Sequence, residues 1–520
     1  MRGFSILVAT AALAGAAALS LRAQDQPAPT FRAGTTLVEF TIVVRDGKGN
    51  PITDLTKDEI VITEEGQPRT VEFFRFDGAP PQPAPNALPP GHFTNRFETA
   101  PNAARHITAI LVDGMNTFTV KQGTFLFTQA SIRTQIRDYL DGLPPHTRVG
   151  LFLLGRDVVD VVHDFTDNLA SLKAKAEKME LVRGEPTLVA GHRPPDFARS
   201  SASGSSEAAE ARGLAAAAEA KGTALQNEVV QVKRVDLTLP ALEALGDHLA
   251  RFPGRKNIVW VGNGMPIRLG RRGAARDFEE RMRSTAQRLA TQGVALYPVS
   301  SRLSTESVKE SLNLFADVTG GRVTLTMNDP IEGLKTTALD QRAIYSLGFY
   351  AVAPPDNKWH PITVQVKRPG VTVTHRQGYL SETPAAQPLE WGEEHWRSAL
   401  ANPLGSSVVR LDGQVDPVTG AAAGTFDFRM QIALDDLHFR DADGKRVAEV
   451  EIVTAEKVAS GDFAFRVERA SLGAPANAAP GATAPYTRRW ALRPDTVTVR
   501  VIVRDRFTAR FGTLDMPVGK

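Results

Sequence analysis

The chain of 520 residues is too long for one hydrophobic core, and roughly three domains are expected at this length. Hydrophobic residues make up 42% of the chain and charged residues 23%, which is typical of a globular protein. The formal net charge is only +3, whereas a dedicated nucleic-acid binder normally carries a strongly basic stripe. The composition therefore argues against a nucleic-acid partner.

The first residues have the pattern of a secretory signal peptide. Arg2 precedes an apolar run over residues 4–21, and Ala23 is a small residue suited to cleavage before Gln24. We therefore expect residues 1–23 to be removed and the mature chain to be exported, to the periplasm or outside the cell. An uncleaved membrane anchor is the alternative. No later segment of the sequence is apolar for long enough to span a bilayer.

No catalytic pattern is found in the sequence. The chain has no cysteine, which excludes disulfides, thiolate metal sites and a cysteine nucleophile. It also lacks a nucleophile elbow, a His-Glu-x-x-His motif and a phosphate-binding glycine loop that ends in lysine. The ten histidines are scattered singly. We therefore expect a protein that is not an enzyme.

Short strands and tight turns follow the signal sequence. Residues 37–44 alternate between apolar and polar and lead into Asp46-Gly47-Lys48-Gly49-Asn50-Pro51, which is a strong turn signal. Further short strands predict a small β-sandwich-like module over residues 33–78. Residues 79–103 begin with a Pro-rich stretch and are expected to form a stiff linker.

From residue 104 to 380 the pattern changes to strands that alternate with amphipathic helices. Repeated helix–strand units predict the α/β class, with a doubly wound, mostly parallel sheet. An antiparallel hairpin within residues 343–375 is expected to close this domain. Residues 183–233 are rich in Ser, Ala and Glu and offer no apolar face, so we expect a flexible insertion that is disordered or transiently helical.

The last part of the chain, residues 391–520, is predicted to be an all-β domain. Its strands include residues 425–434 and 496–504, separated by turn signals. In the second of these, every other residue from 497 to 503 is valine. One face of that strand is therefore purely apolar, as expected for a sheet that packs on one side.

Two strand-to-loop corners in the α/β part carry polar residues. Residues 106–117 form an apolar strand that runs into Asp113, and residues 256–266 form another that ends in Gly262-Asn263-Gly264. Ligands of open parallel sheets bind just beyond the carboxyl ends of such strands. We therefore expect the two corners to face each other across one crevice.

At this point the chain resembles the bacterial VWFA-related domain proteins, a divergent branch of the von Willebrand factor type A fold. The resemblance covers residues 35–380 and implies a type A α/β domain flanked by small all-β domains. Its motifs are Val43-Val44-Arg45-Asp46-Gly47-Lys48-Gly49, Leu55-Thr56-Lys57-Asp58, Glu65-Gly66, the corner from Asp113 to Thr117, Asp164-Phe165-Thr166, Tyr345-Ser346-Leu347-Gly348-Phe349-Tyr350, Pro369-Gly370 and Arg376-Gln377-Gly378-Tyr379.

The resemblance also implies a metal-ion-dependent adhesion site. In type A domains this site has Asp-x-Ser-x-Ser on a first loop, Thr on a second loop and Asp on a third. Here the first loop supplies Asp113 and Thr117, Thr238 stands in the corner before a helix, and Asn263 takes the third position. These four oxygen donors are the expected ligands of Mg²⁺ or Ca²⁺, whereas Met115 offers a thioether, which is the wrong donor class.

The alternative for the first loop is that Asp113 and Thr117 only cap the following helix. The leading interpretation is an exported, non-enzymatic module for binding or adhesion. It would hold a protein or glycan partner at the crevice through a degenerate adhesion site. The competing interpretation is a structural envelope or matrix protein, in which the α/β domain is a scaffold without metal or ligand.

Overall fold

The computed structural model of the chain describes residues 37–78, 88–96, 106–114, 120–121, 124–125, 129–143, 147–155, 159–180, 206–250, 252, 254–270, 276–301, 304–326, 331–352, 354–422, 424–442, 445–475 and 478–518. The expected signal peptide, much of the expected linker and the first part of the expected insertion lie outside these residues. Within them, no helix is both long and apolar enough to cross a membrane.

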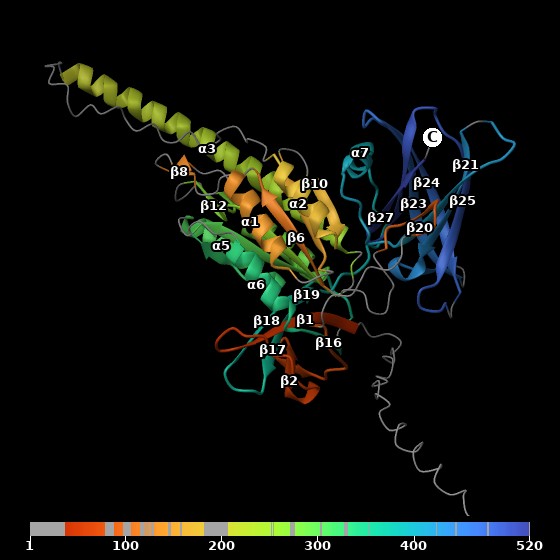
Figure 1. The fold of residues 1–520 in the computed structure, drawn as a ribbon, viewed down its shortest axis with the longest axis horizontal. Helices are drawn as coiled ribbons and strands as arrows, with labels where there is room; N and C mark the ends of the chain where they lie inside the picture. The colour runs from red at the N-terminus through yellow and green to blue at the C-terminus, as the bar shows by residue number, and fades with distance from the viewer. Residues whose placement is uncertain are drawn as a thin grey trace, which may run out of the picture. The chain divides into compact units, whose positions relative to one another are not determined.

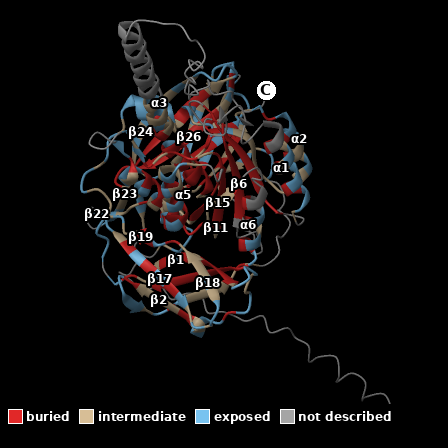
Figure 2. Ribbon diagram, turned by 90° about the vertical axis from the view of Figure 1, so that its left-hand side faces the viewer, coloured by how far each residue is buried: buried red, intermediate tan, exposed pale blue. Residues whose placement is uncertain are grey.

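A six-stranded sheet forms the centre of the α/β part, with the strand order β10-β9-β6-β11-β14-β15. The five strands from β9 to β15 run parallel, and β10 pairs antiparallel with β9. Their apolar side chains are buried because helices cover both faces (Figure 2). The strands are β6 (His106–Asp113), β9 (Val149–Leu154), β10 (Val159–Thr166), β11 (Arg255–Val261), β14 (Val294–Ser301) and β15 (Thr324–Thr326).

Among the described residues, six helices cover this sheet, three on each face. Figure 1 shows three of them, α2, α1 and α6, side by side. Alternate residues of each strand point to opposite faces, so Leu111 and Trp260 pack in one apolar cluster and Ile110 and Val259 in the other. The arrangement confirms the α/β class. One face carries α1 (Gln129–Asp141), α2 (Leu169–Lys178) and α6 (Ile331–Gln341), and the other carries α3 (Ser206–Leu249), α4 (Glu279–Thr291) and α5 (Glu306–Thr319).

Two short hairpins complete this part of the chain. One pairs β7 (Val120–Lys121) with β8 (Thr124–Phe125), and the other pairs β12 (Arg268–Leu269) with β13 (Arg276–Asp277).

The N-terminal strands form a sandwich together with strands from residues 344–380. One sheet has the order β18-β1-β16-β4 and the other β19-β17-β2-β3, and both bury side chains such as Phe40, Ile62, Leu347 and Val364 in one core. The hairpin predicted between residues 362–366 and 371–375 is not formed, because these two strands lie in opposite sheets of the sandwich and pair with β2 and β1. The elements are β1 (Leu37–Asp46), η1 (Lys57–Glu59), β2 (Ile60–Glu64), β3 (Gln67–Arg69), β4 (Phe73–Phe76), β16 (Ile344–Tyr350), β17 (Trp359–Val366), β18 (Val371–His375) and β19 (Gly378–Leu380).

The C-terminal part is built from two further antiparallel sheets that share a core, and a short helix, α7 (Glu393–Ala401), precedes them. Residues 92–94, which the composition assigned to the linker, form β5 and pair with β20. The strands are β5 (His92–Thr94), β20 (Leu411–Pro417), β21 (Thr425–Ala433) and β25 (Thr483–Ala491) in one sheet, and β22 (Arg440–Ala442), β23 (Lys445–Val458), β24 (Phe463–Ala474), β26 (Thr496–Asp505) and β27 (Phe511–Pro517) in the other, with η3 (Leu434–Asp436) between β21 and β22.

Helix α3 is much longer than the apolar periodicity predicted. The pattern indicated a helix only from Pro240, but α3 already begins at Ser206 and carries Pro240 in its interior. The Ala, Glu and Arg residues before it have high helix propensity, which supports the extension. Residues 206–233 are thus helical, and the predicted mobility of residues 183–233 stays a prediction.

A buried ion pair joins the N-terminal sandwich to the α/β part. Arg45 Nη1 of β1 lies 3.0 Å from Asp340 Oδ1 of α6, and both side chains are almost fully buried. Asp340 also accepts hydrogen bonds from the Tyr297 hydroxyl at 3.1 Å and from Arg322 Nη2 at 3.4 Å. One carboxylate is therefore contacted by three side chains, from β1, β14 and the segment before β15.

Asp340→Asn is expected to lower the free energy of unfolding by about 3–5 kcal/mol, because it leaves the buried Arg45 without its counter-charge. Urea denaturation followed by circular dichroism measures the change. Asp138→Asn is the control, because it removes an ion pair with Arg137 in which both partners are about half exposed. Its effect should stay below about 1 kcal/mol. Equal losses in the two variants would contradict the role assigned to Asp340.

Candidate functional site at the ends of β6 and β11

The two polar corners lie next to each other in the structure. Strands β6 and β11 are parallel neighbours, with Val112 opposite Val261, so Asp113 and Gly262 follow side by side. A Cβ atom added at Gly262 would lie 2.8 Å from the Asp113 Cβ and 3.4 Å from its Oδ2. Any side chain at position 262 would therefore collide with Asp113. We refer to Asp113, Gly262 and Asn263 as the β6/β11 edge.

The topology makes this edge a special position in the sheet. From β6 the chain passes through α1 to β9 on one side, and from β11 it passes through α4 to β14 on the other side. Helices α1 and α4 cover opposite faces of the sheet. The connections thus diverge between β6 and β11, which is the switch point where open α/β sheets hold their ligands.

Asp113 is fully buried at this edge, and its charge is compensated from two directions. Trp260 donates its indole N–H to Asp113 Oδ2 at 3.2 Å. The second compensation is electrostatic and involves Arg234 of α3. Burial lowers the pKa of Arg234, and the negative charge of Asp113 opposes that shift. Arginine nevertheless keeps its proton at neutral pH, so a positive charge faces the buried carboxylate.

The path of α3 explains why Arg234 reaches this edge. The helix ends at Leu249, close before β11 starts, and packs against the sheet on the way. Arg234 precedes Leu249 by fifteen residues, which correspond to about 22 Å of helix. The seven residues of β11 rise about 23 Å. Arg234 therefore lies level with the carboxyl end of β11.

Thr238 follows Arg234 by one helical turn and is fully buried. The expectation that Thr238 stands in a loop before a helix is not met, because α3 continues through it. Its Oγ1 has no hydrogen-bond partner among the described residues. Asn263 lies half-buried directly after Gly262. Thr117 and Met115 lie outside the residues that the structure describes.

The described residues fit a divalent cation poorly. Mg²⁺ and Ca²⁺ prefer several oxygen ligands that include carboxylates, but Asp113 is the only carboxylate of the expected set, and Trp260 already donates to it. Arg234 adds a positive charge that repels a second cation. Within the described parts of the chain, no group of three or more His, Cys, Asp or Glu could hold a metal ion. Metal binding by Asp113, Thr117, Thr238 and Asn263 stays a prediction.

The two residues that compensate the charge of Asp113, Arg234 and Trp260, were not found by the sequence analysis. Trp260 lies on β11 two residues before Gly262, in a run that indicated only a buried strand. Arg234 lies four residues before Thr238, which places both on one face of a helix. That spacing can be used as a signal only if the helix is known to begin well before Pro240 in the sequence.

No protein-family model matches the chain, and no curated protein matches it. Among solved structures, it is similar to proximal thread matrix protein 1 from the mussel byssus, with 10% identity and a TM-score of 0.26 over 47% of this chain and 48% of that one. The chain thus spans about half the length of the mussel protein, which has also been solved with a zinc-occupied MIDAS motif. A von Willebrand factor type A protein from Catenulispora acidiphila has 8% identity and a TM-score of 0.27 over 94% of this chain and 74% of that one. Similarity at this level carries no argument about what this chain binds.

Proposed function

We propose that the protein is an exported, non-enzymatic binding module that holds a protein or glycan partner at the β6/β11 edge. The observation that carries this proposal is the position of Asp113, Gly262 and Asn263 at the switch point of the parallel sheet. The glycine leaves backbone instead of a side chain beside Asp113. Asp113 and Gly262 are buried, so the half-buried Asn263 is the residue of this edge that a partner would contact.

In this proposal the positive charge of Arg234 takes the place of a metal ion, so the edge is a degenerate metal-ion-dependent adhesion site. A buried carboxylate needs a compensating charge, and the guanidinium supplies it permanently. A second cation beside Asp113 would then be repelled by Arg234. Partner binding at this edge is consequently expected to be independent of divalent ions.

Cleavage after residue 23 is the first expected outcome, because the apolar run after Arg2 has the length of a signal sequence. Intact-mass measurement on protein recovered from the periplasm or the medium should give a chain that starts at Gln24. A mature chain that retains residues 1–21 would instead identify the segment as a membrane anchor.

The double variant Arg234→Ala with Asn263→Asp is expected to gain Mg²⁺ binding, because it removes the competing cation and adds a second carboxylate. Wild type and Asn263→Asp alone, which both keep Arg234, should bind at least about tenfold more weakly. Titration calorimetry with Mg²⁺ and Ca²⁺ measures all three. Tight binding by wild type that is lost in Asp113→Ala would contradict the substitution of metal by Arg234 and support Asp113, Thr117, Thr238 and Asn263 as ligands.

Asn263→Lys should reduce partner capture from an envelope fraction at least about tenfold, because it adds bulk and a positive charge at the β6/β11 edge. Quantitative mass spectrometry of proteins and glycans captured on the immobilised chain measures this, with and without a chelator. Thr291→Lys is the matched control, since it lies exposed at the other end of the sheet. Equal capture by both variants would reject the edge as a binding surface and leave the envelope or matrix scaffold.

A further inference from the structure

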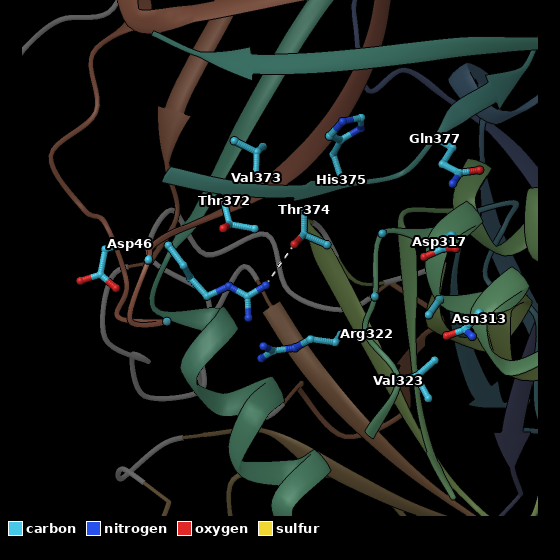
Figure 3. A pocket seen from close by; sticks show the side chains of 16 residues that line it. Asp46, Asn313, Asp317, Arg322, Val323, Thr372, Val373, Thr374, His375 and Gln377 are labelled. Carbon is cyan, nitrogen blue, oxygen red and sulfur yellow. Dashed lines mark hydrogen bonds between the residues drawn. The ribbon is translucent and has the colours of Figure 1, made fainter. Parts of the chain in front are cut away.

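A separate cleft lies at the amino-terminal end of the six-stranded sheet, between the N-terminal sandwich and the α/β part (Figure 3). It has a volume of about 720 Å³. We call it the junction cleft. Its walls come from the turn after β1, strand β18, the end of α5 and the start of β15, and the polar side chains in them include Arg45, Arg322, Thr372, Thr374, Asn313 and Gln377. It shares no residue with the β6/β11 edge.

Two guanidinium groups in this cleft share one carboxylate. Arg45 Nη1 and Arg322 Nη2 both approach Asp340 Oδ1, at 3.0 Å and 3.4 Å. Arg45 also donates from Nη2 to Thr374 Oγ1 at 3.0 Å, the bond marked by the dashed line in Figure 3. Two positive charges thus face one negative charge, which leaves an excess of one positive charge.

A third cation lies behind Asp340 and adds to this excess. Arg255 is almost fully buried and donates to the Tyr297 hydroxyl at 3.0 Å and to Thr41 Oγ1 at 3.2 Å. It also donates to the Gly320 carbonyl. All of these acceptors are neutral, so Arg255 contributes its full charge to the surroundings of the cleft.

The two guanidiniums of the cleft also have unused donors. Among the described residues, neither Arg45 Nη1 nor Arg322 Nε has a hydrogen-bond acceptor, and both nitrogens are shielded from solvent. The contact of Arg45 Nη1 with Asp340 is an ion pair without hydrogen-bond geometry. Charge that is not hydrated acts strongly on its surroundings. Arg322 exposes 41% of its side chain, so a ligand in the cleft can touch it directly.

Two further carboxylates, Asp46 and Asp317, line the cleft, but neither forms an ion pair with Arg45 or Arg322 among the described residues. Asp46 uses its oxygens within its own turn, where it accepts from Lys48 N, Asn50 N and Asn50 Nδ2 at 2.8–2.9 Å. Figure 3 shows its carboxylate at the far end of the cleft from Arg322. Asp317 is exposed on α5, so solvent and salt screen its charge.

The threonines of β18 add neutral donors on the same side. Figure 3 shows Thr372 and Thr374 directed towards Arg322, whereas Val373 and His375 point to the opposite side of the strand. Thr374 Oγ1 accepts from Arg45, which leaves its own O–H available as a donor. Guanidinium groups beside hydroxyl donors form the usual environment of a bound carboxylate or phosphate.

We propose that the junction cleft binds a small molecule through an anionic carboxylate or phosphate group, which lies against the exposed guanidinium of Arg322 and the hydroxyls of Thr372 and Thr374. A volume of about 720 Å³ falls within the range of small-ligand sites. The inference is independent of the partner site at the β6/β11 edge.

Titration calorimetry and thermal unfolding test the proposal, with inorganic phosphate and citrate as probes and sodium chloride at matched ionic strength as the reference. Arg322→Gln should weaken probe binding by about ten- to a hundredfold, because it removes a charged donor. Arg283→Gln is the matched control, since Arg283 is 46% exposed in an ion pair on α4. It should bind like wild type.

A second pair of variants tests the charge without any added ligand. Thr372→Glu places a carboxylate beside Arg322, whereas Thr372→Gln has nearly the same shape without the charge. Thr372→Glu should unfold at a higher temperature than Thr372→Gln and should no longer bind either probe. Thr372 is exposed, so neither variant disturbs the core.

Each outcome supports or rejects the site. Binding of phosphate alone supports a phosphate ester as the ligand, binding of citrate alone supports a carboxylate, and binding of both supports their shared chemistry. Probe binding that Arg322→Gln leaves unchanged means an adventitious ion only and overturns the proposal. So does the absence of binding together with equal unfolding temperatures of the two Thr372 variants.

Discussion

The buried ion pair between Arg45 and Asp340 constrains how the sandwich and the α/β part are arranged. It ties the first strand of the sandwich to the last helix on the sheet, and both partners are removed from water. A buried carboxylate is tolerated only when donors surround it. Tyr297 and Arg322 meet that requirement from β14 and from the segment before β15. The requirement for several donors brings the arginines together, and their convergence forms the junction cleft.

The buried carboxylates at the two ends of the sheet have different numbers of guanidinium partners. At the carboxyl end, one carboxylate, Asp113, faces one guanidinium, Arg234, and the charges balance. At the amino end, one carboxylate, Asp340, is shared by both Arg45 and Arg322, and no other described carboxylate forms an ion pair with either. A balanced site has little need of an added ion, whereas an unbalanced one attracts a counter-ion. This contrast is the reason for proposing a metal-free contact surface at one end of the sheet and an anion site at the other.

The sequence predicted local features well and distant pairings poorly. The apolar runs before Asp113 and Gly262 indicated parallel strands, and the switch-point rule correctly placed the two corners together. The pairing of β1 with β16 joins residues about 300 positions apart, and no local pattern encodes it. Arg234 was missed because Pro240 marked a helix start, although the residues before it have high helix propensity and the helix continues through it.

Some strands of the sandwich precede the α/β part in the sequence and the others follow it, and this order affects how the protein folds. Strand β4 pairs with β16, so the whole α/β part lies in the sequence between two strands that pair with each other. Pairings over such distances form slowly, because closing the loop costs entropy before the contacts are made. Arg45 belongs to the sandwich and Arg322 to the α/β part. The junction cleft therefore exists only when these two parts have packed against each other. A ligand held there binds the closed state alone, and mass action therefore shifts the equilibrium towards the assembled protein.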